Sequence, residues 1–344
     1  MKFDESSLYN IKSKLDGIRC SLYDLAIWKN GFAFKKIDFS ETGRPVIKIA
    51  ELNNGISSNT SFTQGNYSED VFIQWDDLLF SWSGNPKTSI DVFRYRLQDG
   101  WLNQHIFKVT ANEDLVTKDF LYYVLKFLKP HFTEIATNKQ TTGLGHVTIA
   151  DLKRMSLVVP LKEVQNQIVS ILKAIDDKIE VNKNINDNLQ QQATAIFKSW
   201  FVDCTPFDGV APETWRDVTL EEITTLVSRG IAPKYSYDSE QTVINQKCIR
   251  NHMIDLSLAR THTPKVINEK WLRFGDLLIN STGDGTLGRA AQVWFQPKNL
   301  TVDSHVTIVR PANENLIFYI GLWGILHEKE IESLHTGSTG QTEL

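Results

Sequence analysis

The glycine-rich run GDGTLG at Gly283–Gly288 is the motif with the most specific potential chemistry, because it has the GxGxxG spacing of a dinucleotide-binding turn. In such a turn a helix opens at the third glycine, and its backbone N–H groups bind a pyrophosphate. Asp303 lies near the distance at which a ribose-binding carboxylate is expected. Here, however, the chain continues as RAAQVWF, which predicts a strand. We therefore favour a β-turn over a nucleotide-binding site.

No other catalytic pattern is evident in the sequence. The eight histidines have no HxxxH spacing, and the three cysteines, Cys20, Cys204 and Cys248, have no CxxC spacing. These features argue against a metal centre and against a disulfide framework. The chain has no GxSxG turn and no Walker A motif. The tripeptide Asn85–Lys87 is similar to the Asn-Pro-Pro-aromatic motif of amino-methyltransferases, but the second proline and the aromatic residue are missing. The sequence therefore predicts no catalytic residue and no metal.

The remaining candidates are polar and basic side chains in glycine-containing loops. Side chains of these types bond base edges and phosphates, and glycine lets a backbone approach a duplex. The candidates for DNA contact are Lys35, Lys36, Arg44, Ser83, Asn85, Lys87, Arg229, Lys234, Tyr235, Ser281, Thr282 and Arg289. The alternative is that these loops are ordinary solvated loops, and the loops by themselves favour that alternative.

An internal repeat predicts which elements position these loops. The motifs WDDLLFSWSGN and NQHIFKVTANED, a helical stretch and the exit TTGLGHVTIADL recur in the same order as FGDLLINSTGD, DSHVTIVRPANEN, FYIGLWGIL and GSTGQTEL. The matched pairs are Asp77 and Asp276 (199 residues apart), His105 and His305 (200 apart), and Gly143 and Gly340 (197 apart). The sequence therefore predicts two copies of one domain.

The sequence of each copy predicts a mixture of strands and helix. DLLF and DLLI are short buried strands, and HIFKV and HVTIV alternate as strands do. LYYVLKFLKPHFTEIA has helical spacing with an interruption near Pro130. We expect the two matched histidines to be structural residues at a strand end. The predicted fold is α+β, with the domain repeated once.

A long helix is predicted between the copies, because no glycine or proline occurs from Leu161 until Pro206. Apolar positions alternate gaps of four and three residues, which is the period of a coiled-coil seam. The seam positions are Ile168, Leu172, Ile175, Ile179, Asn182, Asn186, Leu189, Ala193, Ile196 and Trp200. Such a seam is roughly 50 Å long and needs a partner helix. The alternative is a helix packed on one of its own domains, but the flanking repeats favour a spacer.

Length and charge limit the class of protein. The 344 residues predict two domains, and 37 Lys+Arg against 41 Asp+Glu give a net charge of −4. A protein that binds DNA by itself through many phosphates is strongly basic. If DNA is the partner, local basic loops contact it and another subunit neutralises most phosphates. The longest apolar run, Leu316–Leu326, is too short to cross a bilayer, and the start MKFDESS is not a secretory signal. We expect a cytoplasmic protein.

The central run from Pro160 to Asp203 resembles the central conserved region of the specificity subunits of type I restriction–modification systems. The matching parts are PLKEVQNQIV, IDDKIEVNKNIN and AIFKSWFVD. WKNGFAFKK at Trp28–Lys36 and PETWRDVTLEEITTLVSRG at Pro212–Gly230 are similar to the entries of the family's two target-recognition domains. TTGLGHVTIADLKRMSLVVPL and GSTGQTEL are similar to the exits of those domains. Segments with this similarity occur along nearly the whole chain.

The resemblance implies a non-catalytic DNA reader. Residues 1–160 and 205–344 would be target-recognition domains, and each would read one half of a bipartite site in double-stranded DNA. Residues 161–204 would be the spacer helix that binds methylation subunits. Those subunits would supply S-adenosylmethionine and adenine-N6 methylation, and restriction subunits would act with ATP and Mg, so that this chain would hold no cofactor. Readers held roughly 50 Å apart could address DNA segments more than one helical turn of about 34 Å apart.

The sequence departs from the family pattern at its end. In the family a second conserved region follows the second recognition domain and pairs antiparallel with the first helix, whereas this sequence stops at Leu344 within GSTGQTEL. We therefore expect a form truncated before its second conserved region, whose seam associates with another copy of the chain. The alternative function is a coiled-coil assembly or inhibitory protein that sequesters restriction–modification subunits without reading DNA.

Overall fold

The computed structural model describes residues 17–140, 143–283 and 285–334. The chain divides into two compact units, Met1–Val181 (unit 1) and Asn182–Leu344 (unit 2). The exit motif GSTGQTEL, Thr141 and Asp284 lie outside the described residues. Among the helices of the described part, none is long and apolar enough to cross a membrane.

Unit 1 is centred on an antiparallel sheet of order β2-β10-β6-β8. Its strands are β2 (Ala26–Asn30), β10 (Ile106–Ala111), β6 (Leu78–Ser81) and β8 (Asp91–Arg94). Side chains alternate across this sheet, as a strand requires. Leu78 and Phe80 pack with α3 (Lys118–Asn138), whereas Leu79 packs with residues of a second sheet. The central sheet of unit 1 is therefore buried on both faces.

The second sheet of unit 1 has the order β4-β3-β9-β5, in which β3 and β9 are parallel. Its strands are β4 (Phe62–Thr63), β3 (Arg44–Ile47), β9 (Gly100–Leu102) and β5 (Phe72–Ile73). Two short ladders join β1 (Gly17–Ser21) to β12 (Ser156–Pro160) and β7 (Ser83–Gly84) to β11 (Gly145–His146). The short helices are η2 (Tyr23–Leu25), η3 (Lys36–Asp38), α2 (Ile49–Asn54), η4 (Glu69–Val71) and α4 (Ile149–Arg154).

Unit 2 repeats this arrangement. Its main antiparallel sheet has the order β13-β21-β18-β19, and a second sheet has the order β17-β14-β20 with β14 and β20 parallel. The strands are β13 (Thr224–Arg229), β21 (Val306–Pro311), β18 (Leu277–Asn280), β19 (Ala290–Gln292), β17 (Arg260–Thr261), β14 (Thr242–Ile244), β20 (Leu300–Val302), β15 (Ile249–Arg250) and β16 (Met253–Ile254). The helices are η6 (Thr205–Phe207), α6 (Leu220–Ile223), η7 (Gln246–Cys248), η8 (Leu256–Leu258), η9 (Asn268–Lys270), η10 (Glu314–Leu316), α7 (Ile317–Leu326) and α8 (Glu328–Ser333).

The two units share one topology, which confirms the predicted repeat and the α+β class. The strand that overlaps each unit's entry motif lies at the edge of the main sheet, next to the strand that begins after the matched histidine. Gly31 and Gly230 occupy matched places just after β2 and β13. At each of them a Cβ would collide with backbone carbonyls, of Asn103 and of Val302 respectively. Glycine is therefore required at both positions because two backbone segments approach closely.

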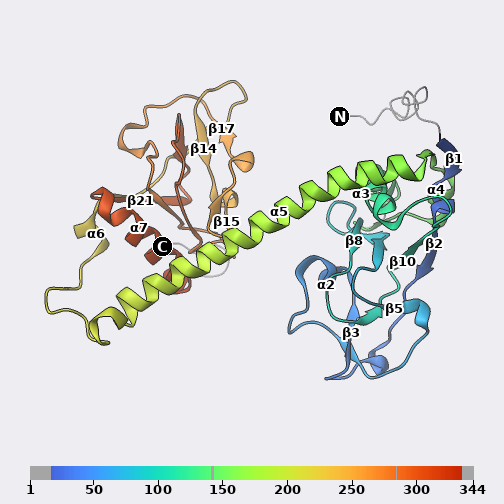
Figure 1. Cartoon of the computed structure of the whole chain (residues 1–344). Coiled ribbons are helices and arrows are strands. Elements are labelled where there is room, and N and C mark those ends of the chain that lie inside the picture. Colours follow the sequence, from blue (N-terminus) through green and yellow to red (C-terminus); the bar gives the residue numbers. More distant parts are fainter. Residues whose placement is uncertain (1–16, 141–142, 284, 335–344) are drawn as a thin grey trace. The chain divides into compact units, whose positions relative to one another are not determined.

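The predicted long helix is present as α5 (Lys162–Phe197), which is unbroken over its 36 residues (Figure 1). It continues into a π-helical turn at Lys198–Val202, which was not predicted. This turn lets Phe197 and Phe201 both contact Tyr319, at ring-centroid distances of 5.4 and 5.0 Å. Because a π-turn is wider than an α-turn, Trp200 does not continue the α-helical phase of the seam.

The predicted interruption near Pro130 is wrong, since α3 continues through Pro130 to Asn138. Pro130 is exposed, so that water can bond the carbonyl group that loses its helical partner. The buried residues Leu125, Leu128 and Phe132 hold the helix on the sheet on both sides of the proline.

Candidate nucleic-acid interface

In unit 1, the loop that carries Lys35 and Lys36 is packed on a cluster of aromatic rings. Phe34 lies 5.0 Å from Tyr67, and Tyr67 lies 5.3 Å from Trp101, between ring centroids. The backbone N–H of Lys35 donates to the Asp38 carboxylate at 2.6 Å, which closes the turn η3. Both lysine side chains are exposed on this fixed turn.

Arg44 belongs to the same region of unit 1. It begins β3, and its guanidinium carbon lies 4.9 Å from the centre of the Phe72 ring and 5.8 Å from the Trp101 ring. A guanidinium over aromatic faces keeps its charge and is attracted by the ring quadrupole. The structure thus brings Lys35, Lys36 and Arg44 to one aromatic cluster, although they come from different elements.

Ser83 begins β7 shortly after β6 ends, and Asn85 and Lys87 lie in the turn that follows β7. The carbonyl oxygen of the Asn85 side chain accepts from the backbone N–H of Lys87 at 3.0 Å. The preceding Trp82 donates its indole N–H to the Asn30 side chain at 3.0 Å, and its ring lies 5.8 Å from His105. This turn therefore lies where β2 and β6 end and β10 begins.

In unit 2, matching polar residues lie at the corresponding ends of the main-sheet strands. Arg229 ends β13, and Thr282 follows β18. The Thr282 hydroxyl is 2.7 Å from Nδ1 of His305, which directly precedes β21. The register places Arg229 opposite Thr307, and Asn280 opposite Val306. Both units therefore present polar side chains at the end of the main sheet where two strands end and a third begins directly after the matched histidine.

Sequence reasoning did not include Asn30, His105 and His305 among the candidates for DNA contact. It treated the histidines as structural strand-end residues, yet the structure shows both with exposed side chains beside predicted contacts. The shared 200-residue offset was the signal that could have selected the histidines.

Three other predicted residues of unit 2 lie on neighbouring loops. Arg289 donates to the backbone carbonyl of Gly285 at 2.6 Å, which fixes it on the glycine-rich turn. Lys234 is exposed, and its carbonyl accepts from the Thr263 N–H at 2.8 Å. Tyr235 lies under Arg260, whose guanidinium carbon is 3.5 Å from the ring centre.

Ser281 does not face solvent as expected. Its side chain is 1% exposed, and its hydroxyl is hydrogen-bonded to the Thr307 hydroxyl and to the carbonyl of Ile279 at 3.3 Å. Successive side chains of a strand point to opposite faces, so Ser281 points to the same face as Ile279, two residues before it in β18. Its role in this structure is to join β18 to β21.

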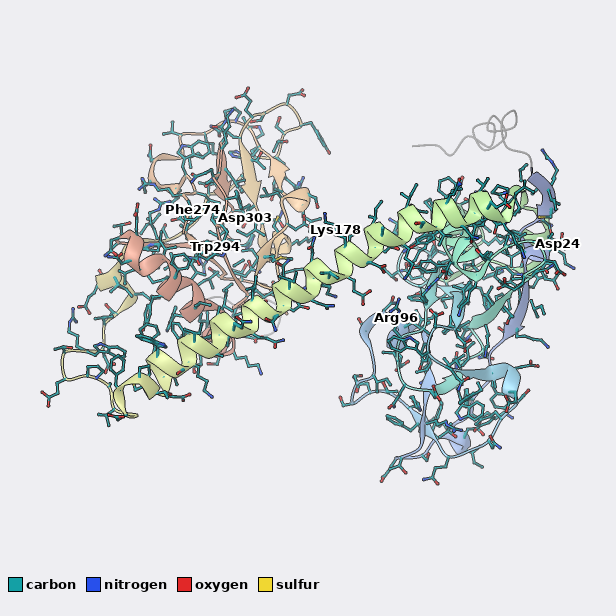
Figure 2. The ribbon with its side chains drawn as sticks, viewed as in Figure 1. Asp24, Arg96, Lys178, Phe274, Trp294 and Asp303 are labelled. Atoms are coloured by element: carbon teal, nitrogen blue, oxygen red, sulfur yellow. The ribbon has the colours of Figure 1, made fainter. Side chains whose placement is uncertain are left out.

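The described residues of the glycine-rich run form turns and lead into a strand, as the β-turn interpretation expected. The N–H groups of Thr286 and Leu287 donate to the carbonyl of Gly283 at 3.1 and 3.0 Å, and a strand begins at Ala290. Asp303 is 3% exposed and accepts from the backbone N–H of His305 at 2.9 Å (Figure 2). Burial raises the pKa of the Asp303 carboxyl above its ordinary value.

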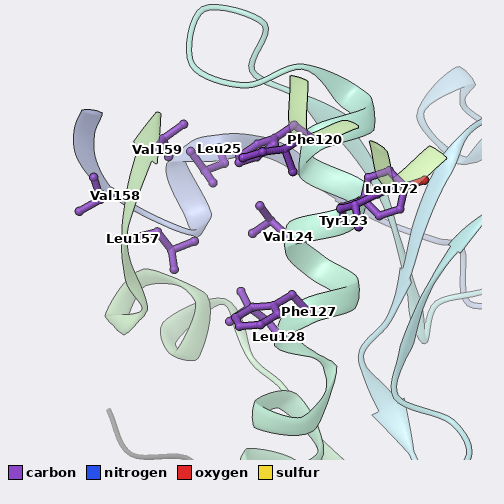
Figure 3. Close-up of a pocket in the computed structure, with 11 residues that line it drawn as sticks. Leu25, Phe120, Tyr123, Val124, Phe127, Leu128, Leu157, Val158, Val159 and Leu172 are labelled. Carbon is purple, nitrogen blue, oxygen red and sulfur yellow. The ribbon is translucent and has the colours of Figure 1, made fainter. Parts of the chain in front are cut away.

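The first part of the helix seam is covered by unit 1. Val169 is buried in the unit 1 core, with Ile168 packed against it. Ile168 and Leu172 line an apolar pocket of about 260 Å³ between α5, α3 and β12 (Figure 3). The phenol of Tyr123 on α3 donates to the Asp176 carboxylate at 2.9 Å. At this end, therefore, the helix is packed on its own domain, as the alternative interpretation expected.

The middle of the seam is exposed in the described part of the chain. Ile175, Ile179, Leu189 and Ile196 are between 52% and 61% exposed. Asn182 and Asn186 are exposed too, as is Lys178 beside them (Figure 2). We call Ile175, Ile179, Asn182, Asn186, Leu189 and Ile196 the exposed stripe. At the unit 2 end, Ala193 is half-buried, Phe197 is buried, and Gln190 is hydrogen-bonded to His252.

Comparisons with known proteins give the family. The family model described as the type I restriction modification DNA specificity domain matches residues 20–191. The HindI specificity subunit of Haemophilus influenzae is 32% identical over 148 residues, which cover 41% of this chain and 32% of that protein. The MjaIX specificity subunit of Methanocaldococcus jannaschii is 24% identical over 226 residues, which cover 59% of this chain and 50% of that protein. The matches thus span from 32% to 50% of the length of these relatives.

A solved structure agrees in fold. The S subunit of a type I restriction–modification system from M. genitalium matches with a TM-score of 0.56 and 16% identity, over 97% of this chain and 80% of that one. The family model itself covers half of the sequence. The chain therefore belongs to the DNA specificity family of type I restriction–modification systems, a family of non-catalytic subunits.

Proposed function

We propose that this chain reads a bipartite site in double-stranded DNA, with one half-site read by each unit. The observation that carries the proposal is the repeated arrangement at the ends of the main-sheet strands. There, both units present polar and basic side chains on fixed turns. The proposed contacts are Lys35, Lys36, Arg44, Ser83, Asn85 and Lys87 in unit 1, and Arg229, Lys234, Tyr235, Thr282 and Arg289 in unit 2. Ser281 is left out because its hydroxyl is buried.

The domain assignment follows from the same proposal. Residues 1–160 and 205–344 act as the recognition domains, and residues 161–204 act as the spacer. Methylation subunits bind the spacer helix and methylate adenine N6 with S-adenosylmethionine. Restriction subunits join through that complex and use ATP and Mg, so that this chain holds no cofactor of its own. An apolar surface in the middle of a long helix is the kind of surface that another helix covers.

Self-association through the exposed stripe is a further part of the proposal. If two copies of α5 pair antiparallel about the midpoint between Asn182 and Asn186, each asparagine lies opposite the other asparagine of the second copy. The same register sets Ile179 opposite Leu189 and Ile175 opposite Ala193. The two polar positions then pair with each other, and apolar positions meet apolar positions. Buried amides weaken such a seam but fix its register.

Selection of random duplexes with the complex of this chain and its methylation subunits tests the proposal. We expect a consensus with two separated parts. If the complex forms but selects no sequence, the chain is an assembly or inhibitory protein that acts through its exposed stripe, and the proposal fails.

A second test removes charge from one loop. In the same complex, Lys35→Ala with Lys36→Ala should weaken DNA binding and reduce the slope of log affinity against log salt by about 2, since each phosphate contact contributes about 0.9. Lys153→Ala is the control for loss of an exposed lysine, because Lys153 is exposed on α4, outside the proposed DNA contacts and outside the spacer helix. An unchanged affinity and salt slope would remove this loop from the interface.

A further inference from the structure

The apolar pocket between α5, α3 and β12 of unit 1 is large enough to receive a side chain from another molecule. Its volume is about 260 Å³, and it is lined by ten apolar side chains and Tyr123 (Figure 3). Of the lining residues, Phe127 is 59% exposed and Val158 is 44% exposed, so apolar surface of the pocket is open to solvent. An apolar cavity of about 150 Å³ holds a benzene ring. We call this site the α3–α5 pocket.

The α3–α5 pocket is continuous with the exposed stripe of α5. Leu172 lines the pocket, and it precedes Ile175, the first residue of the stripe, by three residues in the same seam. One turn of an α-helix contains 3.6 residues. A second helix that covers the stripe therefore reaches the pocket if it continues past Ile175 by one turn.

The antiparallel register of the seam brings one part of a second copy to this pocket. The register that pairs asparagine with asparagine sets Ile175 opposite Ala193. One turn further along, it sets Leu172 opposite Ile196. Ile196 is 59% exposed, and it lies in the α-helical part of α5, before the π-helical turn. Ile196 of the second copy is therefore the side chain that faces the pocket.

Unit 2 shows that this end of α5 can pack on a helix of the same kind. α7 follows β21 and packs on the main sheet of unit 2, as α3 follows β10 and packs on the main sheet of unit 1. Phe197 and Phe201 of the α5 end contact Tyr319 of α7. Because Ile196 stays exposed beside these contacts, the α5 end can contact its own unit and a second molecule at the same time.

The composition of the seam favours additional contacts at its two ends. Asn182 and Asn186 occupy the middle of the seam, and buried amides weaken helix pairing. A two-fold symmetric pair uses the same surface of both copies, so the α3–α5 pocket would be filled twice in each dimer. Burial of an apolar side chain at each end of the seam offsets the cost of the amides.

We infer that the α3–α5 pocket is the docking site for the C-terminal end of α5 from a second copy of this chain, with Ile196 of that copy beside Leu172. The inference rests on the self-association within the proposed function, and it adds the contacts that fix the register. Unit 1 of each copy binds the α5 end of the other copy, and a dimer contains two such contacts.

Disulfide trapping of the full chain tests the register. One variant carries Leu172→Cys and a second variant carries Ile196→Cys, and the two are mixed under reducing conditions and then oxidised. We expect a disulfide-linked dimer from the mixture. Each variant alone should give no more of it than the wild type, whose three cysteines set the background. A disulfide joins Cα atoms less than about 7 Å apart, whereas Leu172 and Ile196 of one helix are about 36 Å apart.

Two other variants test the pocket in sedimentation equilibrium of the full chain. Ile196→Ala should raise the dissociation constant of the dimer about a hundredfold, since each of the two contacts is expected to contribute about tenfold. Val124→Phe fills the pocket from α3 and should also weaken the dimer, with urea unfolding used to show that the variant remains folded. Ile27→Ala is the matched control, because Ile27 is 58% exposed on β2 and is not among the residues that line the pocket.

The possible results separate the inference from the proposed function. A dimer that forms without the mixed disulfide, or that is unaffected by Val124→Phe, overturns the inference. A disulfide above background in one variant alone indicates parallel pairing and also overturns it. If Val124→Phe weakens capture of the methylation subunits but not the dimer, the pocket belongs to those subunits and the inference fails. A wild-type chain that stays monomeric refutes the proposed self-association itself, and sequence selection by the complex is measured separately.

Discussion

Gln165 joins the start of α5 to two other elements of unit 1, and its replacement by glutamate gives a sharp prediction. Its side chain is 0% exposed. Nε2 donates to the carbonyls of Leu115 at 2.8 Å and of Pro160 at 2.9 Å, and Oε1 accepts from the Thr117 N–H at 2.9 Å. One amide therefore connects α5 to the residues before α3 and to the end of β12.

Gln165→Glu keeps the shape of the side chain and replaces its donor group by an oxygen. The carbonyls of Leu115 and Pro160 lose their donor, and an ionised carboxylate would face both of them. Each buried acceptor left without a donor costs about 1–3 kcal/mol, so we expect the free energy of unfolding to fall by about 3 kcal/mol near neutral pH. A protonated carboxyl can still donate to one carbonyl, so that the loss should be smaller in acid.

The sign of the pH dependence follows from this difference. Burial beside two carbonyls raises the pKa of the introduced carboxyl in the folded variant above its unfolded value of about 4.3. Below the unfolded pKa the carboxyl is neutral in both states and the loss is smallest. The loss should grow with pH by about 1.4 kcal/mol per pH unit and level off above the folded pKa.

Urea unfolding of the full chain at about pH 5 and about pH 8 measures the effect, with the first two turns of α5 followed by amide hydrogen exchange. Gln167→Glu is the matched control, since Gln167 is exposed on the same helix. The reasoning would be refuted if Gln165→Glu lost no more stability than this control, or lost the same amount at both pH values.

Two further pairs of substitutions test other parts of the structure. Arg310→Met removes the guanidinium that donates to Asp276 at 2.8 and 2.7 Å, and the carboxylate left buried should destabilise unit 2 by about 3–5 kcal/mol in urea unfolding. Adding Asp276→Asn should recover part of that loss, and a second variant as unstable as the first would contradict the ion-pair explanation. Asn182→Leu with Asn186→Leu should tighten self-association of the full chain in sedimentation, because apolar residues replace amides in the proposed seam. A chain that stays monomeric with and without these changes would argue against pairing through the exposed stripe.

The sequence by itself determined the repeat and the long helix. Motifs such as DLLF and DLLI recur with one offset, and they form the matched strands β6 and β18 of equivalent sheets. The 3.5-residue period continues without a turn signal, and α5 is unbroken from Lys162 to Phe197. These features depend on local periodicity and on turn residues, which are written in the order of the chain.

Only the tertiary structure decided how individual polar groups are used. It turned Ser281 inward to Thr307 and let α3 continue through Pro130. It also brought Arg44 onto Trp101, and it buried the Gln165 amide against two other elements. The partners in these contacts are far apart in sequence, and the free energy of a polar group depends on whether a partner is present where water has been excluded. Local pattern therefore predicts the strands and helices, whereas the direction and bonding of a single side chain depend on the packed fold.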